Sequence, residues 1–367
     1  MRVTDAMLPR IAADFDVGIA GAAAVITVFA IAYGVMQMVF GPLGDRYGKL
    51  RVIASASGAA AVASAACFSV GEFTALVAAR AIAGGFCACI IPLAMAWIGD
   101  TVDYRDRQPV LARFLLGQIL GIGAGAAVGG FAAEDPAWRW PFAALAAWFA
   151  VASVLIALEA RVSPRPARPA QGGPATDVKS ILESRWARIV IGTVSVEGML
   201  VFGALAFVPT HLHFARGVPL SRAGLALLAF ASGGILFAAF ARTLVRSLGE
   251  VRLAQAGTAA LACGFAVVAL APSAALAAMG CLVAGLGFYC LHNTLQTNAT
   301  QMAPERRGAA VAMFASLFFL GQAIGVAIAG GIAEHFGTTA VLAAVAVAVV
   351  PVGLNFARLR AARTGDY

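Results

Sequence analysis

The chain has 367 residues, of which 61% are hydrophobic and only 12% charged, and its formal net charge is +8. Soluble domains are roughly 45–50% apolar and about 25% charged, so this composition excludes a disordered protein, a coiled coil and nearly every soluble enzyme. The apolar stretches do not alternate with polar residues as the strands of a membrane barrel do. The composition therefore predicts an all-α polytopic membrane protein.

Taken in chain order, the apolar stretches are long enough to cross a bilayer, which takes roughly 20 helical residues. Eleven transmembrane helices are predicted, over residues 17–40, 52–70, 73–98, 109–133, 141–158, 187–209, 223–241, 253–271, 274–297, 309–332 and 338–357. Residues 1–16 carry charges and lack the apolar run of a signal peptide.

Lysine and arginine are divided unevenly between the two sets of connecting segments. One set holds 20 of them and the opposite set holds 5, while Arg80 lies within a predicted helix. Because basic loops stay in the cytoplasm, we expect the first set and the C-terminus inside and the N-terminus outside. The positive charge is thus a topology signal for a bacterial-type inner membrane, and it implies no nucleic-acid partner.

The two halves of the chain resemble each other. The run Leu116–Gly121 recurs as Leu320–Gly325, and each run is followed by a Gly-Gly pair and then by a glutamate, Glu134 or Glu334. Repeats in the same orientation are typical of transporters.

The repeat also indicates the domain limits. We expect an N-terminal bundle at 1–160, a flexible cytoplasmic linker rich in proline and glycine at 161–186, and a C-terminal bundle at 187–367. The glutamine that the repeats share lies in the fourth span of the first half and in the fifth span of the second. We therefore expect a first helix to be encoded upstream of Met1.

A basic motif, Gly41-Pro42-Leu43-Gly44-Asp45-Arg46-Tyr47-Gly48-Lys49-Leu50-Arg51, joins the first two predicted helices. Charge alone predicts a loop that only sets topology. The whole pattern, however, resembles the signature loop between the second and third helices of the major facilitator superfamily. The resemblance implies a conformational latch, in which the aspartate holds one bundle against the other. Its residues here are Gly41, Asp45, Arg46, Gly48, Lys49 and Arg51.

Two further spacings carry the same resemblance. Leu76, Arg80, Gly84 and Ala88, four residues apart, resemble the arginine motif of the fourth family helix, although Ala83 replaces the usual glutamine. An arginine inside a span costs at least about 2.5–3.5 kcal/mol, so Arg80 needs a partner or water, unless it snorkels to the outer surface.

Gly117, Gly121, Gly125 and Gly129 line one helix face and would let another helix approach closely. They resemble the glycine-rich fifth helix of drug:proton antiporters, although Ala126 stands where proline usually follows the third glycine. Plain helix packing explains the same spacing.

Two carboxylates are candidates for proton coupling together with Arg80. Glu197 is the only carboxylate near the centre of a predicted span. Burial disfavours its ionised form and contact with water restores it, which suits a proton carrier; a permanently protonated, hydrogen-bonded carboxyl is the alternative. Asp5 lies in a segment that resembles the outer end of the first family helix, and an exposed loop residue is the alternative there.

Polar residues inside the spans predict a substrate cavity, formed by Tyr33, Gln37, His292, Asn293 and Gln296. Hydrogen bonds between helices near the cytoplasmic end are the alternative for the later residues. The pair His211 and His213 has no evident third ligand, so we expect a solvated surface pair and no metal site.

The resemblance covers nearly the whole chain and points to the drug:proton antiporter and sugar-efflux branch. It implies two six-helix bundles, alternating access, and proton-coupled efflux of small organic molecules. Proton-coupled uptake and a non-transporting fragment are the alternatives. No nucleotide-binding loop or catalytic pair occurs, so we expect no enzyme and no cofactor. The expected partners are a small-molecule substrate, protons and the lipid bilayer, and the expected state is a monomer.

Overall fold

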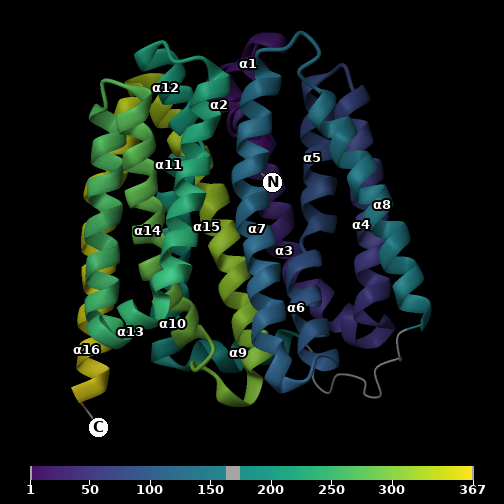
Figure 1. Ribbon diagram of the computed structural model, residues 1–367, viewed down its shortest axis with the longest axis vertical. Helices are drawn as coiled ribbons and strands as arrows, with labels where there is room; N and C mark the ends of the chain where they lie inside the picture. Colours follow the sequence, from purple (N-terminus) through teal and green to yellow (C-terminus); the bar gives the residue numbers. More distant parts are fainter. Residues whose placement is uncertain (1, 163–173, 366–367) are drawn as a thin grey trace.

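The computed structural model describes residues 2–162 and 174–365. Within these ranges the chain is helical and contains no strand. Figure 1 shows two groups of long, roughly parallel helices side by side, one from the first half of the chain and one from the second.

The elements of the first half run from the first described residue to the start of the linker. They are η1 (Arg2–Thr4), α1 (Leu8–Asp14), α2 (Ile19–Ala22), α3 (Ala24–Tyr47), α4 (Lys49–Ser69), α5 (Phe73–Cys87), α6 (Ile90–Thr101), α7 (Tyr104–Ala133) and α8 (Trp140–Val162).

The second half begins with a short helix and a span interrupted by a π-helical turn, η2. Its elements are α9 (Pro174–Glu183), α10 (Arg185–Glu197), η2 (Gly198–Phe202), α11 (Gly203–Leu205), α12 (Val208–Arg216), α13 (Leu220–Leu270), α14 (Ala274–Ala299), η3 (Pro304–Arg306), α15 (Arg307–Phe336) and α16 (Thr338–Gly365).

The membrane-spanning segments agree with the eleven predicted from hydropathy. In the described ranges, 10 helical segments are long and apolar enough to cross a membrane. The longest of them, α13, contains two predicted spans, 223–241 and 253–271, because the chain turns at Gly249. Gly249 has a φ of 67° and a ψ of 173°, a conformation that favours glycine. Each predicted span therefore overlaps one of these helical segments, and at most a few of its residues lie outside that segment.

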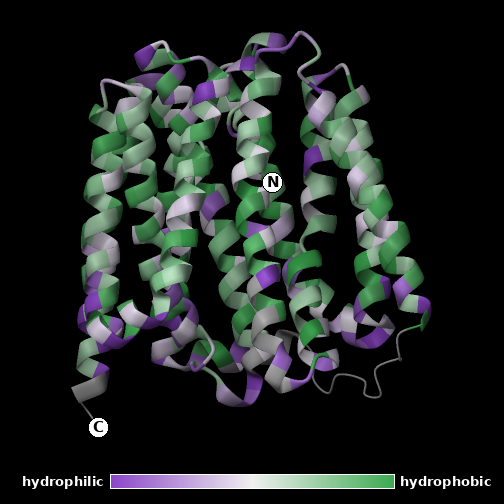
Figure 2. Ribbon diagram, in the orientation of Figure 1, coloured by the Kyte–Doolittle hydropathy of each residue, from purple (hydrophilic) through white to green (hydrophobic). Residues whose placement is uncertain are grey.

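Polar residues gather at the two ends of the helical bundle and apolar residues lie between them (Figure 2). We call the end with the α3–α4 turn and the C-terminus the basic end, and the end with the α12–α13 turn the opposite end (Figure 1). Gly48 ends α3 at the basic end with a φ of 94°, a conformation that favours glycine. Gly41 lies inside α3, where an added Cβ would meet nothing within 4 Å.

The two halves meet through two helix pairs that the internal repeat relates. Helix α3 packs against α15, and α7 packs against α13. In the first pair, Ser316 Oγ donates a 2.6 Å hydrogen bond to Gly34 O. In the second pair, a Cβ at Gly130 would collide with the backbone of Leu220. Glycines and serine thus let backbones of opposite halves touch directly.

The glycine face predicted on α7 is only half used for packing. A Cβ at Gly129 would collide with Val3 O, and one at Gly125 would lie 3.7 Å from Val3 N. Side chains at Gly117 and Gly121 would meet nothing within 4 Å. Within the described residues, η1 therefore packs against the Gly125–Gly129 half of this face only.

The first described residues are buried. Arg2, Thr4 and Asp5 are at most 3% exposed. The alternative of an exposed loop for Asp5 was therefore wrong. The predicted linker is also not wholly irregular, because α9 lies within it and buries Ile181; residues 163–173 lie outside the described ranges.

Candidate functional site

A buried carboxylate lies where the first membrane-spanning segment of the second half changes from α-helix to π-helix. Helix α10 ends at Glu197, and the π-helical turn η2 follows directly. Such turns are rare and occur frequently at functional sites. Gly198 lies so close to α15 that a Cβ would collide with Phe318 O. This contact fixes Glu197 inside the second half, where it is 0% exposed.

Among the described residues, Glu197 has one side-chain partner, which comes from α14. His292 Nδ1 lies 2.7 Å from Glu197 Oε2. Glu197 Oε1 is buried and has no hydrogen-bond partner among the described residues. A buried carboxyl group with an imidazole partner can exist in two forms. It can be protonated and hydrogen-bonded to a neutral imidazole, or it can be ionised and stabilised by a charged imidazole.

Aromatic rings enclose this pair. The His292 ring stacks on Phe288 at 4.8 Å between centroids, and Phe314 and Phe318 lie at 5.4 Å and 5.0 Å. The His292 side chain still keeps 18% of its surface exposed. The pair is thus shielded by aromatic rings, while the His292 side chain stays partly exposed.

Arg80 lies in the first half and does not contact Glu197. Its Nε donates to Val25 O at 3.3 Å, its Nη2 donates to Thr4 Oγ1 at 3.5 Å, and its guanidinium lies 4.3 Å from the Phe29 ring centroid. It is only 3% exposed, so the snorkelling alternative was wrong. The sequence grouped Arg80 with Glu197 for proton coupling, but the side chain that contacts Glu197 is His292.

A second polar centre surrounds the start of the chain. Arg2 Nη1 lies 2.6 Å from Asp5 Oδ2, and both side chains are buried. The Arg2 guanidinium also stacks 4.2 Å from the ring of Phe202, which belongs to the second half. Phe202 in turn packs against Phe288 at 5.1 Å. The rings of Phe202 and Phe288, which we call the aromatic column, therefore lie between the Arg2–Asp5 pair and the Glu197–His292 pair.

The predicted latch residues form ion pairs within the first half. Lys49 Nζ lies 2.6 Å from Asp100 Oδ2 and 3.4 Å from Asp45 Oδ1. Asp45 keeps 42% of its side-chain surface exposed and has no charged partner in the second half among the described residues. Arg46 lies over the Tyr47 ring, and Arg51 is exposed. The latch between bundles stays a prediction.

The predicted cavity residues divide into buried and accessible ones. Tyr33 and Gln37 are buried, and the Tyr33 ring lies 4.3 Å from Phe319 of the opposite half. Asn293 is half-buried and Gln296 is exposed. The five residues therefore do not form one cluster: Tyr33 belongs to the contact between halves, and His292 to the Glu197 pair.

Two polar contacts were not predicted from the sequence. Asn298 Nδ2 donates to Glu250 Oε2 at 3.0 Å, and Arg360 Nε pairs with the same oxygen at 2.7 Å. They tie α13, α14 and α16 together at the basic end, which supports the alternative of inter-helix hydrogen bonding for the end of α14. His211 is also buried, 3.0 Å from Thr338 Oγ1, so the predicted solvated histidine pair was wrong.

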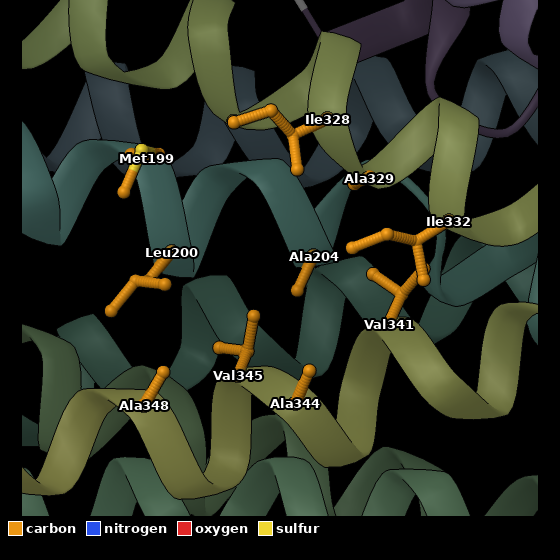
Figure 3. A pocket seen from close by; sticks show the side chains of 11 residues that line it. Met199, Leu200, Ala204, Ile328, Ala329, Ile332, Val341, Ala344, Val345 and Ala348 are labelled. Atoms are coloured by element: carbon orange, nitrogen blue, oxygen red, sulfur yellow. The ribbon is translucent and has the colours of Figure 1, made fainter.

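An apolar pocket of about 110 Å³ lies between η2, α15 and α16 (Figure 3). Met199, Leu200 and Val345 line it, and Ile328 at its edge is 52% exposed. Its lining contains no ionisable side chain. The pocket is separate from the polar contacts of Glu197.

The fold and the buried polar centres can be compared with known proteins. The family model described as Major Facilitator Superfamily matches residues 1–318. The chain belongs to the Major Facilitator Superfamily. Membership of this superfamily indicates transport of a small molecule across a membrane.

Two curated relatives of this superfamily are informative. The uncharacterized MFS-type transporter YceJ of Bacillus subtilis is 23% identical over 350 residues, which covers 90% of this chain and 85% of YceJ. Multidrug resistance protein MdtL of Shigella flexneri is 30% identical over 199 residues. That match covers 53% of this chain and only half, 50%, of MdtL.

Solved structures agree on the fold. The nucleoside transporter NupG, as a D323A mutant, has a TM-score of 0.80 at 16% identity, and the match covers 96% of this chain and 94% of NupG. This likeness confirms the all-α major facilitator fold predicted from the sequence.

Proposed function

We propose that this protein exports small organic molecules by proton-coupled alternating access, with Glu197 as the proton-carrying residue and His292 as its partner. The observation that carries the proposal is the contact between these two groups. Glu197 is fully buried in a membrane-spanning segment, and within the described part of the chain its one ionisable partner is His292, at 2.7 Å. An isolated carboxylate in such a place is stabilised only by protonation or pairing.

The energetics of the pair suit a proton exchanged during the cycle. While the pair holds one proton it has no net charge, either as an ionised carboxylate beside a charged imidazole or as a carboxyl beside a neutral one. Release of that proton leaves an ionised Glu197 beside a neutral His292, and water must then stabilise the negative charge. Opening toward either side brings water to the partly exposed His292 and lets the pair gain or lose a proton there. The inward proton movement would then drive the substrate outward. The membrane potential adds about 2.3 kcal/mol per charge for each 100 mV.

The remaining predicted residues take supporting roles in this proposal. Asp5 pairs with Arg2 in the second polar centre, and Arg80 contacts Thr4 beside that pair. Gln37, Asn293 and Gln296 offer hydrogen bonds to a substrate that enters between the halves. Asp45 and Lys49 act in the predicted latch at the basic end. The excess of arginine and lysine predicts that this end faces the cytoplasm.

The direction of transport is supported by the names of relatives that export compounds. MdtL is named a multidrug resistance protein, and FUB11 of Gibberella moniliformis, 27% identical over 126 residues, is named an efflux pump. These names describe those proteins, and export is therefore the activity to test first here.

The experiment is a growth-inhibition panel in bacteria that lack their main exporters. Cells producing this protein should tolerate at least one class of toxic organic compound better than cells without it. The variant Glu197→Gln, which cannot exchange a proton, should lose this tolerance at equal expression. The control Glu72→Gln changes an exposed glutamate at the start of α5 and should keep full tolerance.

Two outcomes would contradict the proposal. Tolerance retained by Glu197→Gln would remove this residue from the coupling mechanism. No tolerance to any compound, with protein present in the membrane, would contradict export and favour uptake or an inactive protein. Accumulation of a labelled solute by the producing cells would identify uptake.

A further inference from the structure

Glu134, which caps the end of α7, reaches across to the other half of the molecule. Its Oε1 accepts hydrogen bonds from Ser221 N at 3.0 Å and from Ser221 Oγ at 3.1 Å. Ser221 is the second residue of α13. The residue that precedes this helix, Pro219, offers no side-chain cap. A carboxylate from the first half therefore caps the first helix turn of α13 in the second half.

Glu334 makes the reverse contact. It lies in the last turn of α15 and its Oε2 accepts a hydrogen bond from Ala20 N at 3.3 Å. Ala20 is the second residue of α2, whose preceding residue, Gly18, also has no side chain to cap it. A Cβ at Gly18 would lie 2.5 Å from Glu334 Oε1, so the glycine leaves room for the carboxylate. Here the second half caps a helix of the first.

The two contacts are equivalent by the internal repeat. Each glutamate follows a Gly-Gly pair in the repeated segment, and each accepts from the second backbone N–H of a helix in the opposite half. Beside each contact the halves touch closely, at Gly130 with Leu220 and at Gly330 with Ala20. Both lie at the opposite end of the bundle, away from the basic end (Figure 1).

We propose that Glu134 and Glu334 form a reciprocal latch that holds the two halves together at the opposite end, which the topology assigns to the outside of the cell. Opening at this end separates α7 from α13 and α15 from α2. Each separation removes a carboxylate from a helix N-terminus, whose free N–H groups and dipole it stabilises. The latch thus favours the state that is closed outside. This inference rests on the alternating access of the proposed function.

The latch requires that its two contacts break together, because the halves move as bodies. Loss of one glutamate should therefore loosen the other contact as well. A side-chain cap typically changes such an equilibrium by a factor of about five. Glutamine keeps an acceptor oxygen but loses the charge, so its effect should be smaller than that of alanine.

The experiment is hydrogen exchange measured by mass spectrometry on the full chain in lipid nanodiscs, at fixed pH and without substrate. In Glu134→Ala, the backbone amides at the start of α2, near Glu334, should exchange about fivefold faster than in the wild type. In Glu334→Ala, the amides at the start of α13 should do the same. Glu72→Ala, an exposed glutamate at the same end without a contact to the second half, should change neither segment.

Faster exchange only at the helix that each glutamate itself caps would overturn the latch, because it shows local fraying. Unchanged exchange at both helices would overturn it as well. If Glu134→Ala is not recovered as folded protein, Glu134→Gln is measured in its place, with a smaller increase expected at α2. Neither readout depends on proton coupling, so failure of the latch and failure of Glu197 as proton carrier are distinguishable.

Discussion

At the scale of single residues, the proposed proton coupling depends on Glu197 and His292, which are far apart in the sequence. Glu197 could be selected from the sequence because it is the one carboxylate near the centre of a span. His292 was predicted only as a cavity residue, 95 positions away, because helix spacing gives no information on which helices of a bundle are neighbours. The same limit explains why Arg80 was assigned to Glu197 although it contacts Thr4.

The pair makes a prediction for His292. In His292→Leu, no imidazole remains to stabilise the ionised carboxylate, so Glu197 should stay protonated and transport should fall by tenfold or more, roughly the 1.4 kcal/mol or more expected for loss of a charged hydrogen-bond partner. His292→Gln, which can still donate a hydrogen bond, should lose less. The measurement is the rate of substrate export at equal protein level.

A matched control on the same helix is Thr297→Val. The Thr297 hydroxyl donates to Asn293 O within α14, so its loss should leave the export rate nearly unchanged. Equal rates for His292→Leu and the wild type would contradict the role of the pair.

At the scale of helices, hydropathy was sufficient to predict every span. Backbone N–H and C=O groups in lipid must form hydrogen bonds within their own segment, so a long apolar stretch becomes a helix. Packing partners were predicted less well. The spacing of Gly117 through Gly129 predicted one close contact face, yet the contact with α13 runs through Gly123 and Gly130. Several faces of α7 carry small residues, and which of them is used depends on the position of helices distant in sequence.

The repeat provides an internal comparison between equivalent glycines. A Cβ at Gly325 would collide with the backbone of Met199, whereas one at Gly121, its equivalent in the first half, would meet nothing within 4 Å. Gly325→Ala should lower stability by about 1–3 kcal/mol through overpacking. Gly121→Ala should be neutral or slightly stabilising, because alanine favours helix more than glycine. Thermal unfolding in detergent, followed by tryptophan fluorescence, compares the two variants; equal melting temperatures would contradict the packing described for α10–η2 and α15.

At the scale of the whole molecule, two similar halves meet along α3–α15 and α7–α13 and carry one polar centre each. Glu134 and Glu334 connect the halves at the opposite end, whereas at the basic end Lys49 pairs with Asp45 and Asp100 within the first half. The sequence predicted the halves from their repeat, but it did not predict the cross-contacts of Glu134 and Glu334, which were seen only as a repeated residue type.

The most direct test of the central claim is substrate-driven proton movement in proteoliposomes that contain a pH-sensitive dye. Addition of a substrate found in the growth panel should move protons in the direction opposite to the substrate with the wild-type protein and with Glu72→Gln. With Glu197→Gln incorporated to the same level, the proton signal should vanish. An undiminished proton signal from Glu197→Gln, or substrate transport by the wild type without any proton movement, would contradict proton coupling through Glu197.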